Sequence, residues 1–138
     1  PTTGLDPEER IRIRNLLVDF GRDRSVLFSS HVVEDLASTC NDLCILKKGK
    51  KIYDGTIQHL ICEADNHVFS CMLSSEEEFL KVQEKYKITG KNYSNEGIDI
   101  RLVSKSVPDV TGIEFQYVKP TLEDAYIYKS SSEKFEEI

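Results

Sequence analysis

Apolar positions recur with a helical spacing in the first part of the chain. The repeat consists of Ile13, Leu16, Leu17 and Phe20. These positions follow the i, i+3, i+4, i+7 pattern of an amphipathic helix. Upstream, Asp6 is a typical N-cap, Pro7 fits the first helical position because its missing N–H costs nothing there, and Glu9 stands at the capping-box position. The pattern predicts a helix of about four turns that ends near Gly21.

The next apolar run is continuous and does not alternate with polar residues. It consists of Val26, Leu27 and Phe28, within residues 25–30, and His31 follows it. Such a run is typical of a short strand buried on both faces, as in a parallel sheet. A helix over about 32–40, a strand over 43–46, a hairpin turn at 48–50 and a short helix from Thr56 are expected next. The first part therefore favours an α/β fold.

The pattern changes around residues 63–66, where we expect a domain boundary. The second part has the order β-α-β-β-β-α, with strands near 67–73, 88–93, 98–103 and 112–118 and helices that begin at Ser74 or Ser75 and at Thr121 with Asp124. This order predicts a small α+β unit with an open sheet and its helices on one face. The domains are thus expected at 1–63 and 64–130, followed by a flexible tail at 131–138.

The chain has 138 residues and a formal net charge of −6. Residues 1–63 hold nine Lys/Arg against ten Asp/Glu, and residues 64–138 hold nine against fourteen. This acidity argues against a nucleic-acid partner, because phosphates demand a surplus of basic residues. The apolar runs are far shorter than the roughly 20 residues that cross a bilayer, and we see no secretory leader. Because the first residue is Pro1 and not methionine, we expect a piece of a longer protein.

The cysteines lack the spacing of a zinc module. They are Cys40, Cys44, Cys62 and Cys71, and only the first two lie close together. A site that recruits His67 to the last two is an open alternative to buried, reduced thiols, which we favour. We therefore expect no bound metal and no disulfide framework.

Two motifs carry a resemblance to a known family. Residues 1–7, Pro-Thr-Thr-Gly-Leu-Asp-Pro, are followed after the predicted helix and strand by Ser29-Ser30-His31. This arrangement resembles the C-terminal half of the ATPase domain of ABC transporters, where the first motif is the D-loop and the histidine is the switch histidine (H-loop). Residues 43–50 and Asp54-Gly55-Thr56 resemble the family's next strand, hairpin and Gly-Thr continuation.

Two further stretches qualify this resemblance. Asn41-Asp42 departs from the Asp-Arg pair that the family has before that strand. Residues 121–126 look like the last helix of the C-terminal extensions found on many bacterial members. The resemblance therefore covers about the first 60 residues well and the second part weakly.

The resemblance implies a fold and a set of roles. The fold would be the C-terminal half of a P-loop NTPase-type parallel sheet, followed by the accessory unit. His31 would be catalytic and nucleotide-binding, since it would contact the γ-phosphate of ATP and help to hold the hydrolytic water. Gly4, Leu5 and Asp6 would touch a second ATP-binding subunit. The intact protein would use ATP and Mg²⁺ and would work with a transmembrane permease, in the cytoplasm at the inner face of the membrane.

Other motifs of the same family are absent from the sequence. No Gly-x-x-x-x-Gly-Lys-Ser/Thr loop and no Leu-Ser-Gly-Gly signature occur, and the family's Asp-Glu pair would stand just before Pro1. We therefore expect no ATPase activity from the chain alone. Two alternatives remain open, a module in which the acidic unit binds a ligand or regulator and a part of a soluble, non-transport ABC ATPase. Ser29 beside His31 lacks a Gly-x-Ser-x-Gly elbow, which excludes a serine hydrolase.

Overall fold

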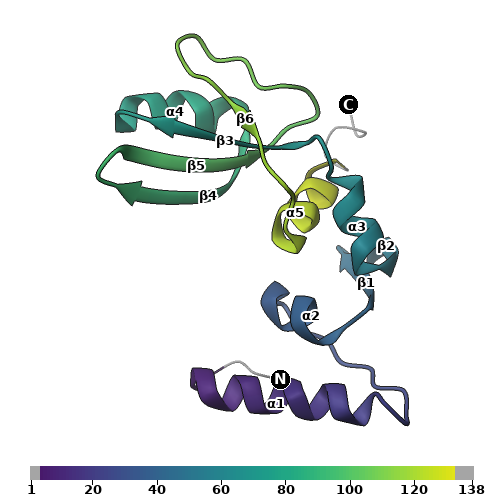
Figure 1. Ribbon diagram of the computed structural model, residues 1–138. Helices are drawn as coiled ribbons and strands as arrows, with labels where there is room; N and C mark the ends of the chain where they lie inside the picture. The colour runs from purple at the N-terminus through teal and green to yellow at the C-terminus, as the bar shows by residue number, and fades with distance from the viewer. Residues whose placement is uncertain (1–3, 133–138) are drawn as a thin grey trace. The chain divides into compact units, whose positions relative to one another are not determined.

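The computed structural model of the chain describes residues 4–132. The fold is mixed α/β with two antiparallel sheets, one of two strands and one of four (Figure 1). The chain divides into two compact units, Pro1–Gln58 (unit 1) and His59–Ile138 (unit 2). Each unit is described by itself below. Of the predicted tail at 131–138, residues 133–138 lie outside the described part of the chain.

Unit 1 contains two helices and a β-hairpin. Its elements are α1 (Pro7–Phe20), α2 (Val33–Thr39), β1 (Asp42–Lys47) and β2 (Lys50–Thr56). The predicted start of α1 is confirmed, because the Asp6 side chain accepts a hydrogen bond of 2.9 Å from the backbone N–H of Glu9. β1 and β2 pair antiparallel through a turn in which Lys48 and Gly49 both have positive φ.

The strand expected at residues 25–30 does not form. The structure assigns residues 25–30 to neither helix nor strand, and Leu27 is 99% exposed. A β-strand is stable only beside a neighbour that pairs its backbone groups, and no described segment pairs with these residues. The expected strand is therefore wrong for this chain, and the parallel P-loop-type sheet is not confirmed.

Unit 2 has the predicted order β-α-β-β-β-α. These elements come after α3 (Ile57–Glu63), within which unit 2 begins; the first two residues of α3 belong to unit 1. Its elements are β3 (Val68–Leu73), α4 (Glu76–Lys85), β4 (Lys87–Ser94), β5 (Gly97–Val103), β6 (Gln116–Tyr117) and α5 (Leu122–Ser132). The strand order is β4-β5-β3-β6, and all pairs are antiparallel. The capping of α4 by Ser75, which accepts a hydrogen bond from the Glu78 N–H, confirms its predicted start.

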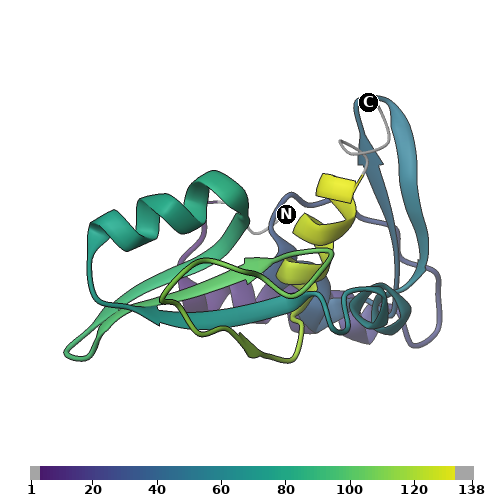
Figure 2. The same ribbon diagram turned by 90° about the horizontal axis from the view of Figure 1, so that it is seen from above.

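The sheet of unit 2 buries apolar side chains on both faces. One cluster lies against α4, which runs along one face of the sheet (Figure 2), and consists of Phe69, Cys71, Leu73, Phe79, Val82, Ile98, Ile100, Leu102 and Val110. Arg101 stands between Ile100 and Leu102, so its side chain points to the opposite face, where it meets Asp124 of α5. The expectation that both helices cover one face is therefore wrong. Buried residues on both sides of β5 require a cover on each face.

Candidate functional site

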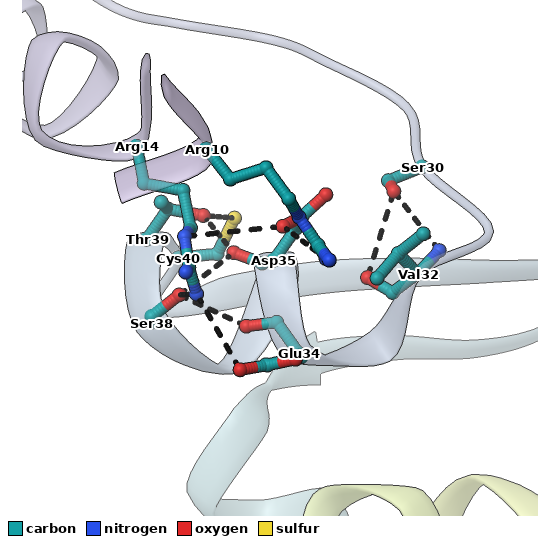
Figure 3. A network of polar contacts seen from close by, with 9 residues as sticks. All are labelled: Arg10, Arg14, Ser30, Val32, Glu34, Asp35, Ser38, Thr39 and Cys40. Carbon is teal, nitrogen blue, oxygen red and sulfur yellow. Dashed lines mark hydrogen bonds and ion pairs between the residues drawn. The ribbon is translucent and has the colours of Figure 1, made fainter. Parts of the chain in front are cut away.

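His31 lies in the turn that leads into α2. Its side chain is exposed. The hydroxyl of the preceding Ser30 accepts a hydrogen bond of 3.0 Å from the backbone N–H of Val32 (Figure 3). This Ser30–Val32 bond spans His31 and fixes the turn in which it stands.

A buried carboxylate joins α2 to α1 directly after this turn. Asp35 in the first turn of α2 is 1% exposed. Its Oδ1 lies 3.6 Å from Nη2 of Arg10 and 3.9 Å from Nε of Arg14, both on α1 (Figure 3). Arg14 also donates a hydrogen bond of 3.0 Å to the hydroxyl of Ser38. We call Arg10, Arg14 and Asp35 the α1–α2 ionic cluster. The cluster holds the helix that follows His31 against the helix that follows residues 4–6.

Removing the carboxylate of this cluster is expected to loosen unit 1. Asp35→Ala leaves two partly buried guanidinium groups without their common partner. We expect the free energy of unfolding of unit 1 to fall by about 1–3 kcal/mol, a modest loss because both ion pairs are long. Amide hydrogen exchange of α1 and α2 in the whole chain measures the loss. The control is Glu34→Ala, because the Glu34 side chain is 72% exposed and pairs with Arg14 only at 3.9 Å. Equal protection in the two variants would contradict a stabilising role of Asp35.

The residues predicted to form a D-loop, Gly4, Leu5 and Asp6, lie directly before α1. Gly4 has φ +82°, a backbone conformation that suits glycine, and Leu5 is 40% exposed. Asp6 caps α1 with its side chain and is also exposed. Pro1–Thr3 of the motif lie outside the described residues. Within the described part, no hydrogen bond or ion pair joins these residues to His31, so the structure does not bring them together into one site.

Metal-ligating side chains do not cluster in the described part of the chain. Residues 4–132 contain no group of three or more His, Cys, Asp or Glu side chains that could hold a metal ion. No phosphate-cradling glycine loop occurs in the sequence. His31 is the described side chain that we predict to meet a nucleotide, as one of several ligands in a larger site.

No disulfide joins any of the four cysteines, all of which lie among the described residues. Burial raises the pKa of Cys71 to about 11, with a further contribution from the charges of Asp99 and Glu78. Such a thiol stays protonated at neutral pH and is chemically inert. The prediction of buried thiols holds for Cys71 and is wrong for Cys44 and Cys62, which are exposed. The described residues contain no cluster that would form the zinc site with His67.

Among residues 4–132, no helix is both long and apolar enough to span a bilayer.

Comparison with known proteins finds relatives of this chain. No family model matches the chain. It is 28% identical to the Nod factor export ATP-binding protein I of Rhizobium meliloti, over 92% of this chain and 40% of that protein. The namesake from Burkholderia thailandensis is also 28% identical, over 92% of this chain and 44% of that protein. A shorter match of 40% identity to the namesake from Rhizobium leguminosarum bv. viciae covers 46% of this chain and 21% of that protein.

These matches cover most of this chain but only part of each relative. The chain spans about two fifths of the length of the curated relatives that it matches along 92% of its own length. The relatives named here are ABC transporter ATP-binding proteins. The chain is therefore related to ABC transporter ATP-binding proteins, in a way that is consistent with their C-terminal portion.

Proposed function

We propose that this chain is the C-terminal part of the ATP-binding subunit of an ABC transporter. In this proposal unit 1 completes the ATP-hydrolysing domain, and unit 2 is an accessory domain. The observation that carries the proposal is the order of the motifs, with residues 4–6 before α1 and His31 before α2, in a chain that aligns with export ATP-binding proteins along 92% of its length. The intact protein would couple ATP hydrolysis to transport, and the relatives' name favours export.

Apolar side chains are exposed on unit 1, and they support the proposal that a further half of the ATPase domain packs against it. No residue of α1 is buried. Its Ile11 and Phe20 are 51% and 47% exposed, and Leu27 after it is 99% exposed. Apolar side chains gathered in this way are typical of a surface that packs against more protein. We propose that the ATP-binding half of the domain covers this surface and supplies the neighbouring strands that residues 25–30 need.

The residues of unit 1 would then have distinct tasks. Mg-ATP, when bound by the other half, supplies the phosphoryl group that is transferred to water. An imidazole N–H of His31 would donate a hydrogen bond to a phosphate oxygen or to that water, since phosphoryl transfer depends on positioning and charge stabilisation. Gly4, Leu5 and Asp6 would contact a second ATP-binding subunit. A transmembrane permease would be the other partner, which places the complex at the cytoplasmic face of the membrane.

The proposal separates the behaviour of this chain from that of the full-length protein. Isothermal titration of the 138-residue chain with Mg-ATP is expected to show no micromolar binding. The full-length protein that contains the chain is expected to bind and hydrolyse Mg-ATP, and to hydrolyse it faster with its permease in lipid vesicles. Micromolar binding of Mg-ATP by the chain alone would contradict the proposal that the other half of the domain supplies most of the ATP site. Absence of Mg-ATP binding by the full-length protein would overturn the proposed function.

A further inference from the structure

Unit 2 contains a small cavity that the proposed ATPase function does not use. Its volume is about 200 Å³. Three segments line it: residues 85–87 at the junction of α4 and β4, residues 103–106 at the end of β5, and Tyr128 with Ser131 on α5. A space of this size is below the range of drug-sized ligand pockets, so it suits a ligand with a single ring.

Three lysines converge on this cavity although unit 2 is acidic. Residues 59–138 hold nine Lys/Arg against fifteen Asp/Glu. Lys85, Lys87 and Lys105 all line the cavity, and Lys85 and Lys87 are exposed. Among residues 4–132, no carboxylate forms an ion pair with Lys85 or Lys87. The like charges of Lys85 and Lys87 at one small opening repel each other, and a bound anion would relieve that repulsion.

One wall of the cavity is aromatic and held in place. The Tyr128 ring stacks on His67, with centroids 4.7 Å apart, and Nδ1 of His67 lies 3.0 Å from the Ser104 carbonyl oxygen. Offset or edge-on aromatic contact is the geometry that such rings favour, and a ligand ring would extend it.

Hydroxyl groups complete the lining. Ser104, Ser106 and Ser131 line the cavity beside the lysines. Burial raises the pKa of Tyr128, and the charge of Glu63 adds to the effect. The Tyr128 hydroxyl therefore stays protonated at neutral pH. Nζ of Lys129 pairs with Glu63 at 3.1 Å, which offsets the acidic charge nearest to this tyrosine.

We propose that this cavity, formed by the lysines at the α4–β4 junction and after β5 and by the ring of Tyr128, binds a small aromatic anion with one ring and a carboxylate or phosphate group. The ligand ring lies against Tyr128, and the anionic group meets the ammonium groups and serine hydroxyls. The site belongs to unit 2 alone. It makes unit 2 a ligand-binding domain, and this role does not depend on the proposed ATPase function of unit 1.

Titration of the ¹⁵N-labelled 138-residue chain with phenyl phosphate and with benzoate tests the site. Amide shifts are expected at residues 85–87 and 103–106, with weaker binding at high salt. Lys85→Gln combined with Lys87→Gln is expected to weaken binding about tenfold. The matched control is Lys81→Gln, an exposed lysine of α4 outside the cavity, which is expected to leave affinity unchanged.

Uncharged and ringless probes test the two halves of the ligand. Benzyl alcohol lacks the charge and inorganic phosphate lacks the ring, so both are expected to bind more weakly than phenyl phosphate. Binding of either aromatic anion at residues 85–87 and 103–106 supports the site. No binding of either at about 10 mM overturns it. Equal weakening by the double variant and by Lys81→Gln, or equal affinity for inorganic phosphate, overturns it as well.

Discussion

Replacing His31 with alanine in the full-length protein is expected to lower ATP turnover by about 100-fold or more. The affinity for ATP is expected to stay nearly unchanged, because most phosphate contacts would come from the other half of the domain. The physical reason is that His31 would act on charge that develops during transfer to water, whereas ground-state binding depends on the phosphate loop. Steady-state hydrolysis and equilibrium ATP binding, measured on the same variant, separate the two effects.

A second histidine provides the control for this experiment. His59 on α3 has a side chain that is 69% exposed and faces Glu63 at 3.9 Å. His59→Ala is expected to keep wild-type turnover. His31→Gln retains a side-chain N–H donor, so it is expected to recover part of the activity that alanine loses. Wild-type turnover in His31→Ala would refute the switch role, and a parallel loss of ATP binding would indicate a structural role.

Helix starts could be predicted from the sequence because their causes are local. Asp6 caps α1 through an N–H three residues away, and Ser75 caps α4 in the same way. Thr121 and Asp124 bond reciprocally at the start of α5, as a capping box requires. Interactions within one helical turn leave a readable pattern in the sequence. The element order of unit 2 was predictable for this reason.

The prediction of a strand at residues 25–30 was wrong because the causes of strand formation are not local. Its apolar run is compatible with a buried strand, but strand formation depends on partners that are distant in sequence. No described segment pairs with it, and Leu27 is exposed. Hydrophobicity indicates a preference for burial, and only a neighbouring strand can satisfy the backbone.

The buried carboxylates show what sequence patterns miss. Asp35 fits a helix N-terminus on sequence grounds, yet the structure buries it against Arg10 and Arg14. The sequence signal that could have indicated this burial was the pair of arginines one turn apart on α1, which present a positive face to a carboxylate. Asp124 was predicted as part of a helix start, and its bonds to Thr89 and Arg101 were not. Both errors concern a polar group whose burial depends on charges from another element.

Asp124 is the side chain of unit 2 whose loss is expected to destabilise it most. It is 1% exposed. Its Oδ2 accepts hydrogen bonds from Arg101, with Nε at 2.8 Å and Nη2 at 2.7 Å, and from the Thr121 N–H at 2.9 Å. Its Oδ1 accepts one from the Thr89 hydroxyl at 2.7 Å. The carboxylate thus joins α5 to β4 and β5.

Asp124→Ala is expected to lower the free energy of unfolding of unit 2 by about 3–5 kcal/mol. The reason is that Arg101 and Thr89 lose the carboxylate to which they donate hydrogen bonds, and α5 loses a cap. Amide exchange of β3 and β5 in the whole chain measures the change. Glu123→Ala is the matched control, since Glu123 is exposed in the same helical turn and is expected to change little. Equal protection in both variants would contradict the role of Asp124.

The pH dependence of the same variant tests the cause. Burial alone would raise the pKa of Asp124, but the hydrogen bonds from Arg101, Thr121 and Thr89 outweigh it and hold the pKa below its ordinary value of 3.8. A group whose pKa is lower in the folded state stabilises the fold above its unfolded pKa and loses that contribution as the pH falls through the folded value. The difference between wild type and Asp124→Ala is therefore expected to be constant from neutral pH down to about pH 4 and to shrink below it. A difference that stays constant into strong acid would mean that packing, and not the charged hydrogen bonds of Asp124, stabilises this contact.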